Sequence, residues 1–393
     1  MKRRTAKAIL ILVVLGMVLL SPQSAAAAPD AGLRQDAQAQ LDTLPLAPLE
    51  EYWQQLPPEA QQVLPDGIRP LIEGEMQGGA QDGETALDFL KDYALNAWTQ
   101  MRNFCVQLIA IVILSAVANA MQSGLRTGQS TNLVSLCTYA CAMCLIIAQI
   151  ASLSVDTAKT IGQIGQWMEL ITPVLTILLV GLGGAVTSGI FQPLTLLLSG
   201  GIIQTIANLV LPLTMASTAA TVISHFAPKD MISKLPKLLL SLTKWTIGIV
   251  MTVFLAVMAI KGLGAASADG ISLRTARYAA GSAIPVVGTM VADTMDTLIA
   301  CSALVKNSIG TTGVLILFLI AALPVVKIFL LMVTLRLCST VAQPLGEQKL
   351  SQAMEDLSTA LSLLMACMIT TAIMSIITIT LFIIAGDWIL MMR

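Results

Sequence analysis

The side chains best placed by type and spacing to take part in chemistry are two carboxylates three residues apart, Asp293 and Asp296. They lie in a stretch, Ile284 to Val305, that is otherwise apolar enough to enter a bilayer. A charged side chain in hydrocarbon costs at least ~2.5–3.5 kcal/mol on insertion scales, so acids kept there indicate a function or a partner. On a helix the two acids share one face, because residues three apart are neighbours. Such a pair facing a water-filled cavity could carry ions or protons across a membrane.

Two interpretations of this segment remain open. In the first, the helix crosses or re-enters the membrane and its acids face a protein interior or cavity. In the second, the helix lies in the interface, its acids face water, and it braces the bundle. In both we expect Pro285 and Gly288 to form the bend at its entry, and Lys306, Asn307 and Gly310 to end it.

Other kinds of catalytic site find little support in the sequence. Glycoside hydrolysis needs an open sugar cleft between two acids, and no exported domain here offers one. Gly262 and Gly264 are not followed by the Lys-Ser/Thr pair of a phosphate-binding loop, which argues against an ATPase. Metal sites need more ligands than the chain collects in any one place. Cys141 and Cys144 have redox-motif spacing but no neighbouring charge, so we interpret them as packing residues. We therefore expect no catalytic residue, no cofactor, no metal and no enzymatic activity.

The composition of the chain is that of an integral membrane protein. Of its 393 residues 56% are hydrophobic and only 11% are charged, and the mean hydropathy is +0.81. A soluble domain carries about 25% charged residues, because it must meet water over most of its surface. The chain cannot cover itself in that way, so it must bury its apolar surface in a membrane.

The N-terminal part reads as an export signal followed by an acidic arm. Residues 1–28 have a basic start, an apolar core and a small-residue cleavage region, typical of a signal peptide, with an uncleaved anchor as the alternative. Residues 29–100 hold 13 acidic residues against three basic ones, and we expect them to form a solvated extracytoplasmic arm with short helices at 49–56 and 58–64. An acidic arm argues against nucleic acid as a partner, because phosphate binding needs clustered Lys and Arg.

The remainder, 101–393, is expected to be an all-α multi-span membrane domain. Continuous apolar windows of about 20 residues are long enough to cross the hydrocarbon core as helices. We predict about seven spans, with six to eight open, and an amphipathic or re-entrant segment at 261–311. The number of crossings and the orientation after residue 190 are not fixed by the charge pattern. The windows lie near 103–121, 133–153, 170–190, 194–223, 238–260, 312–335 and 358–385.

A small-residue pattern interrupts the third window. Gly181, Ala185 and Gly189 recur at every fourth position, which predicts a face where another helix approaches closely. Packing within one protomer, contact between copies of the chain, and a helix break lining a pathway are the three interpretations.

Five blocks within 261–311, which we call the signature segment, carry a resemblance to a known protein family. They are Arg274-Thr-Ala-Arg277-Tyr, Ile284-Pro285-Val-Val-Gly288, Ala292-Asp293, Asp296-Thr297 and Lys306-Asn307-Ser-Ile-Gly310. These blocks resemble those of the stage III sporulation protein AE family of endospore-forming Firmicutes, and the export signal, acidic arm and multi-span architecture fit it too.

This resemblance implies a role that the residues alone do not. It implies a non-enzymatic component of a channel complex between mother cell and forespore, in the outer forespore membrane, needed for late forespore gene expression. The implied partners are a cytoplasmic secretion-type ATPase, ring-forming proteins in the intermembrane space and other membrane proteins, with membrane lipid around the spans; a homo-oligomer is open as well. The alternatives are a free-standing ion-coupled transporter that uses Asp293 and Asp296, and a scaffold whose spans only anchor the arm.

Overall fold

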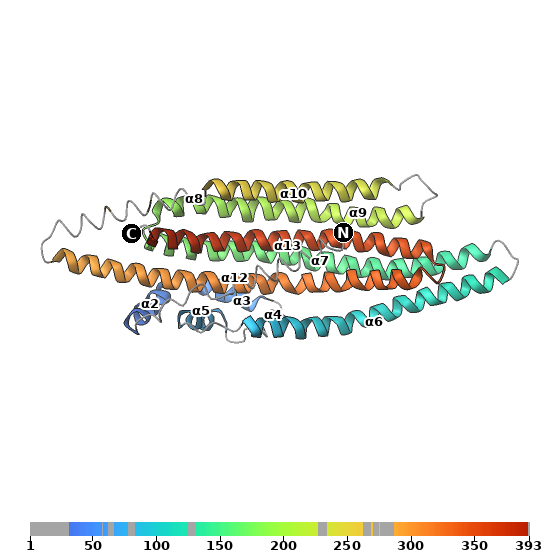
Figure 1. Ribbon diagram of the computed structural model, residues 1–393, viewed down its shortest axis with the longest axis horizontal. Coiled ribbons are helices and arrows are strands. Elements are labelled where there is room, and N and C mark those ends of the chain that lie inside the picture. The colour runs from blue at the N-terminus through green and yellow to red at the C-terminus, as the bar shows by residue number, and fades with distance from the viewer. Residues whose placement is uncertain are drawn as a thin grey trace.

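The fold is a long bundle of helices (Figure 1). The computed structural model describes residues 31–56, 58–61, 67–77, 83–124, 130–226, 234–261, 269, 275 and 287–391. Every regular element within these ranges is helical, and six of the described helices are long and apolar enough to cross a membrane. The prediction of an all-α polytopic membrane protein is thereby confirmed. The expected signal peptide lies outside the described residues.

Four long helices form the body of the bundle: α6 (Gly83–Gly124), α7 (Ser130–Gly181), α12 (Val287–Ala342) and α13 (Gln348–Met391). The two longest, α7 and α12, have 52 and 56 residues. At 1.5 Å per residue they extend for about 80 Å, far beyond the ~30 Å of a hydrocarbon core. A large part of both helices therefore projects from the membrane.

The apolar windows 133–153 and 170–190 are not separate hairpin spans, because α7 runs without interruption from the first into the second. The linking residues show why the helix continues. Their apolar side chains are buried, while Asp156, Lys159 and Glu169 face outward. An amphipathic face of this kind is stable where the helix packs on protein on one side and meets water on the other. The buried side chains are Ile161, Ile164, Trp167, Met168 and Ile171.

A second layer runs alongside α7 and α13 (Figure 1). It begins with α8 (Ala185–Leu196), continues through two π-helical segments, η1 (Leu197–Ile203) and η2 (Ile206–Val210), and ends in α9 (Leu211–Phe226). The antiparallel α10 (Lys234–Lys261) lies against α9. Only 11% of the apolar window of α10 is buried in protein, so this helix exposes most of its apolar surface.

The acidic arm is folded against the body. It consists of α2 (Ala31–Thr43), α3 (Ala47–Gln54), the single turn α4 (Pro58–Gln61) and α5 (Ile68–Met76). α2 and α5 pack on α12, and α3 packs on α7. The apolar edge of α3, Leu49, Tyr52 and Trp53, is buried in these contacts. The arm thus covers the first half of α12 and the second half of α7.

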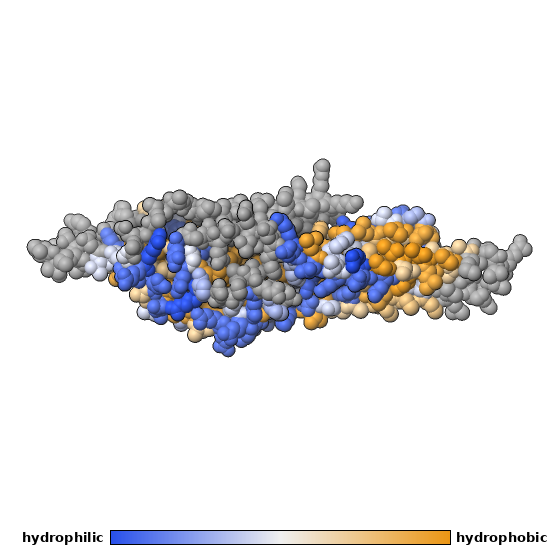
Figure 2. Space-filling view, turned by 90° about the horizontal axis from the view of Figure 1, so that it is seen from below, coloured by the Kyte–Doolittle hydropathy of each residue, from blue (hydrophilic) through white to orange (hydrophobic). Residues whose placement is uncertain are grey.

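Hydrophobic and hydrophilic surfaces are separated along the bundle. On the face seen in Figure 2, hydrophobic residues gather toward the right, and hydrophilic residues make up much of the remaining coloured surface. The hydrophobic part corresponds to the end of the bundle at which α6 turns into α7 and α12 into α13. We call it the apolar band, defined by exposed apolar side chains of α6, α7 and α12. These are Leu95, Trp98, Val106, Ile113, Leu114 and Val117 of α6, Leu136, Ile147 and Val155 of α7, and Phe329, Leu337 and Val341 of α12.

Candidate functional site

The signature segment forms the first half of α12. Arg274, Arg277 and Pro285 lie outside the described residues, whereas Gly288 and Asp293 lie in the first two turns of the helix. The segment does not end near Gly310 as expected, because the helix continues unbroken to Ala342. The half-buried Asp296 lies in the part of α12 that belongs to the arm-covered end of the bundle.

An ion pair holds the second part of the signature segment to α13. Lys306 is completely buried, and its Nζ donates to the main-chain oxygen of Ile383 at 2.7 Å and to Oδ1 of Asp387 at 3.2 Å. The amide of Asn307 reaches the same carboxylate oxygen at 3.5 Å. A buried ammonium is stable only when charge and hydrogen bonds compensate for its lost hydration. Asp387 and the Ile383 carbonyl supply that compensation.

Two glycines allow the helices to approach closely enough for this pair. A Cβ at Gly310 would lie 2.6 Å from Cγ1 of Ile383, and a Cβ at Gly386 would meet the Lys306 ammonium directly. Small residues at helix contacts in membranes bring the backbones close together. Gly310 therefore acts as a contact residue between α12 and α13, which is why the helix passes through it.

The same segment receives the arm about one turn before Lys306. Nε2 of Gln40 on α2 donates to Oγ of Ser302 at 2.7 Å, and the thiol of Cys301 lies 3.6 Å from the main-chain oxygen of Leu33. On α3, the hydroxyl of Tyr52 donates to the main-chain oxygen of Gln163 at 2.7 Å. Burial raises the pKa of the Tyr52 phenol, so the side chain stays neutral and keeps its donor. Polar and apolar contacts together fix the arm to the signature helix and to α7.

The predicted small-residue face is divided between two helices. Gly181 ends α7, whereas Ala185 and Gly189 belong to α8, and the turn between them contains Gly183 with φ of +85°. A Cβ at Gly181 would lie 3.2 Å from Oγ of Ser302, while nothing lies within 4 Å of one at Gly189. Gly181 thus faces the signature helix, and Gly189 faces open space.

The start of α8 is capped by a residue that is distant in sequence. The buried carboxylate of Asp269 accepts the main-chain N–H of Val186 at 2.9 Å and of Thr187 at 2.6 Å. Free N–H groups and the helix dipole make a helix N-terminus favourable for a carboxylate. Asp269 therefore joins the 261–311 segment to the helix break after α7.

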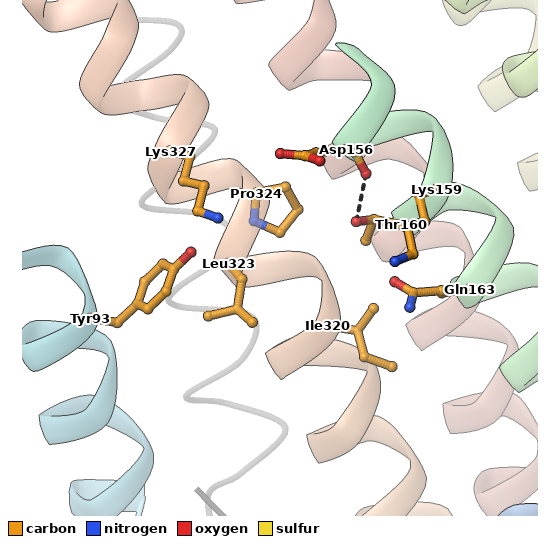
Figure 3. A pocket seen from close by; sticks show the side chains of 9 residues that line it. All are labelled: Tyr93, Asp156, Lys159, Thr160, Gln163, Ile320, Leu323, Pro324 and Lys327. Atoms are coloured by element: carbon orange, nitrogen blue, oxygen red, sulfur yellow. Dashed lines mark hydrogen bonds between the residues drawn. The ribbon is translucent and has the colours of Figure 1, made fainter. Parts of the chain in front are cut away.

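A cavity of about 210 Å³ with both polar and apolar walls lies between α6, α7 and α12 (Figure 3). Lys327 on α12 approaches the ring of Tyr93 on α6, with its Nζ 6.0 Å from the ring centroid. Asp156 and Lys159 come from α7, where the hydroxyl of Thr160 donates to the main-chain oxygen of Asp156 at 2.9 Å. The lining residues are Tyr93, Asp156, Lys159, Thr160, Gln163, Ile320, Leu323, Pro324 and Lys327.

The sequence alone does not indicate which residues contact Lys306 and the other residues of the signature segment. Asp387 is a single acid near the end of a long apolar helix, and no local pattern pairs it with Lys306. Asp269 and the cavity residues likewise depend on contacts between segments far apart in the chain. A useful signal was the lone Lys327 in the apolar window 312–335, since a charge inside such a window marks a partner or a site.

No group of three or more His, Cys, Asp or Glu suited to a metal ion occurs in the part of the chain that the structure describes.

Comparison with known proteins confirms the family resemblance indicated by the sequence. Residues 68–386 match the model of the family described as stage III sporulation protein AE. The stage III sporulation protein AE of Bacillus subtilis (strain 168) is 31% identical over 355 residues, covering 87% of this chain and 86% of that protein. No solved structure matches the chain.

Proposed function

The chain belongs to the stage III sporulation protein AE family and has a role in sporulation, and from this premise we propose that it is a non-enzymatic membrane component of a channel complex between mother cell and forespore. In this proposal it is located in the outer forespore membrane with its arm extracytoplasmic, and it is needed for late forespore gene expression. Its partners are a cytoplasmic secretion-type ATPase, ring-forming proteins of the intermembrane space and other membrane proteins of the complex.

The observation that carries the proposal is the arm docked on projecting helices. α7 and α12 are more than twice as long as a bilayer requires, and α2, α3 and α5 pack on their ends. A rigid projection of this kind can hold partner proteins at a fixed height above a membrane. The exposed acids of α3, Glu50 and Glu51, lie on the surface of that projection.

The chemistry of the signature residues supports a structural role for them. The Lys306 ammonium is occupied by Asp387 and by the Ile383 carbonyl, and Gly310 packs against the side chain of Ile383. Groups that are fully engaged with one another hold helices together. They are not poised to act on a substrate.

Deletion in the native sporulating bacterium, with purification of a tagged copy just after engulfment, tests the proposal. We expect late forespore transcription to fail without the protein, and the secretion-type ATPase and ring-forming proteins to be recovered with it. A Glu50→Gln/Glu51→Gln variant should lose ring-forming proteins and keep the ATPase, while the exposed Glu355→Gln on α13 serves as the control. Normal spores after deletion, or recovery of the protein alone from an extract in which the partners are detectable, would contradict the proposal.

The alternative, an ion-coupled transporter that uses Asp293 and Asp296, is favoured by one observation. η1 and η2 follow one another in a membrane-crossing layer, and π-helical segments often mark functional sites. Replacement of both acids by Asn tests it. Unchanged sporulation at a normal protein level would remove the acids from the mechanism.

A further inference from the structure

The cavity between α6, α7 and α12 contains charges that form no ion pair with the residues the structure describes. Lys159 and Asp156 come from α7 and Lys327 from α12, and all three side chains line the same space (Figure 3). With the described residues, neither lysine forms an ion pair within 4 Å, and Asp156 forms none either. The two ammonium groups and the carboxylate are therefore available to a ligand.

The walls of the cavity orient these groups. The ring of Tyr93 lies 6.0 Å from Nζ of Lys327, a distance at which the ring face attracts a cation. Pro324, which also lines the cavity, has no main-chain N–H to donate. The cavity thus offers two cations and an anion within about 210 Å³.

The cavity lies at one edge of the apolar band. On one side of it, exposed apolar side chains follow on all three helices, beginning with Leu95 on α6, Val155 on α7 and Phe329 on α12. On the other side, the polar Gln166 and Glu169 of α7 face outward before the exposed apolar Ile177 and Val180. A site in this position is in contact with water and hydrocarbon at once.

We propose that the cavity binds the headgroup of a phospholipid. The phosphate lies between Lys159 and Lys327, and the acyl chains extend along the exposed apolar side chains of α6, α7 and α12. Basic pockets between membrane helices are suited to anionic headgroups, because charge pairing and acyl-chain burial act together. Asp156 favours a headgroup that also carries an ammonium group, so phosphatidylethanolamine binds better than phosphatidylglycerol. This inference does not depend on the proposed channel role.

Native mass spectrometry of the full chain in mild detergent, after delipidation and titration with either phospholipid, tests the proposal. The wild-type protein should hold phosphatidylethanolamine tightly. The Lys159→Gln/Lys327→Gln variant should bind it at least about tenfold more weakly, since each lysine supplies a charge-assisted hydrogen bond. Asp156→Asn should shift the preference toward phosphatidylglycerol.

Two matched variants separate binding from folding. Lys244→Gln removes an exposed lysine of α10 away from the cavity and should leave binding unchanged. Lys159→Arg/Lys327→Arg keeps both charges and should retain binding, with thermal unfolding confirming that each variant is folded. Undiminished lipid binding by the double Gln variant would overturn the proposal. If the same lysines bind inorganic phosphate but the protein binds neither phospholipid, the proposal is also overturned. Equal binding of the two phospholipids by the wild type would overturn the role of Asp156.

Discussion

Lys306 and Asp387 form a buried ion pair between two helices although they are 81 residues apart in the chain. The pair is asymmetric, because the Lys306 side chain is completely buried whereas the Asp387 side chain is 35% exposed. Each group depends on the other to a different degree. An ammonium without its partner would have no access to water, but a carboxylate without its partner could still be hydrated.

This asymmetry predicts an order of stabilities. Asp387→Ala leaves the ammonium with only the Ile383 carbonyl and no opposite charge, and should cost about 3–5 kcal/mol, the range for removing one partner of a buried pair. Lys306→Met should cost less, because the remaining carboxylate reaches water. Removing both charges, with Lys306→Met and Asp387→Leu, should recover much of the loss. Unfolding of the purified protein in detergent measures the order, and equal losses for the two single variants would contradict it.

Gly310 provides a second stability prediction. Gly310→Ala should destabilise the protein by about 1–3 kcal/mol through overpacking, because its Cβ would lie 2.6 Å from Cγ1 of Ile383. Ile383 cannot move away easily, since a β-branched side chain in a helix has one strongly preferred χ1 rotamer. Gly248→Ala on α10, with nothing within 4 Å, is the control and should be neutral or stabilising. The same unfolding measurement tests both, and Ile383→Ala should restore part of the stability of Gly310→Ala.

Much of the fold follows from the sequence because the apolar windows are long and free of charge. What the windows do not show is where a helix ends. The stretch around Asp156 and Glu169 is polar enough to suggest a connection between two spans, yet it is helical because its other face packs on protein. Gly310 predicts a helix end by local rules, but it is a contact point between α12 and α13. Tertiary contacts override the local signal at both places.

The candidate site was predictable as a segment but not as an arrangement. Lys306, Asn307 and Gly310 stand out within a recognisable block, whereas Asp387 is an isolated acid at the end of the last helix. Its pairing depends on the antiparallel register of α12 and α13, which no local pattern of residues encodes. For the same reason the sequence does not indicate that Asp269 caps a helix that begins 84 residues earlier.

Docking of the arm should weaken as the pH rises. Burial raises the pKa of Glu75 on α5 above its ordinary value of 4.5, so ionisation disfavours the docked arm. The stabilisation that neutral Glu75 contributes to docking is fully present below that value and is progressively lost as the pH rises through and beyond it. The distribution of distances between spin labels at Gln77 and Leu298 should therefore become broader between pH 4.5 and pH ~7.5.

Two variants test the assignment of this pH dependence to Glu75. Glu75→Gln removes the titrating group and should give the same label distance across the range. The exposed Glu50→Gln on α3 should leave the pH dependence intact. A pH dependence that persists unchanged in Glu75→Gln would assign the effect to another group.

Cys105 on α6 and Cys338 on α12 test the packing of the bundle chemically. Their sulfur atoms lie 3.7 Å apart, whereas a disulfide needs about 2.05 Å, so a small movement brings them into bonding distance. Oxidation of membranes with copper phenanthroline should therefore join the two helices within one chain, as seen by mass spectrometry of non-reduced peptides. Cys105→Ser should abolish that linkage. The exposed Cys137, Cys141 and Cys144 of α7 provide a second comparison, because a disulfide from the α7 of one chain to the α7 of another forms only where the α7 surfaces of two copies touch. A link between Cys105 and Cys338 without a linked dimer would support the helix packing described. It would also argue against contact between copies of the chain through the α7 surface. Failure to link Cys105 to Cys338 would contradict the helix packing itself.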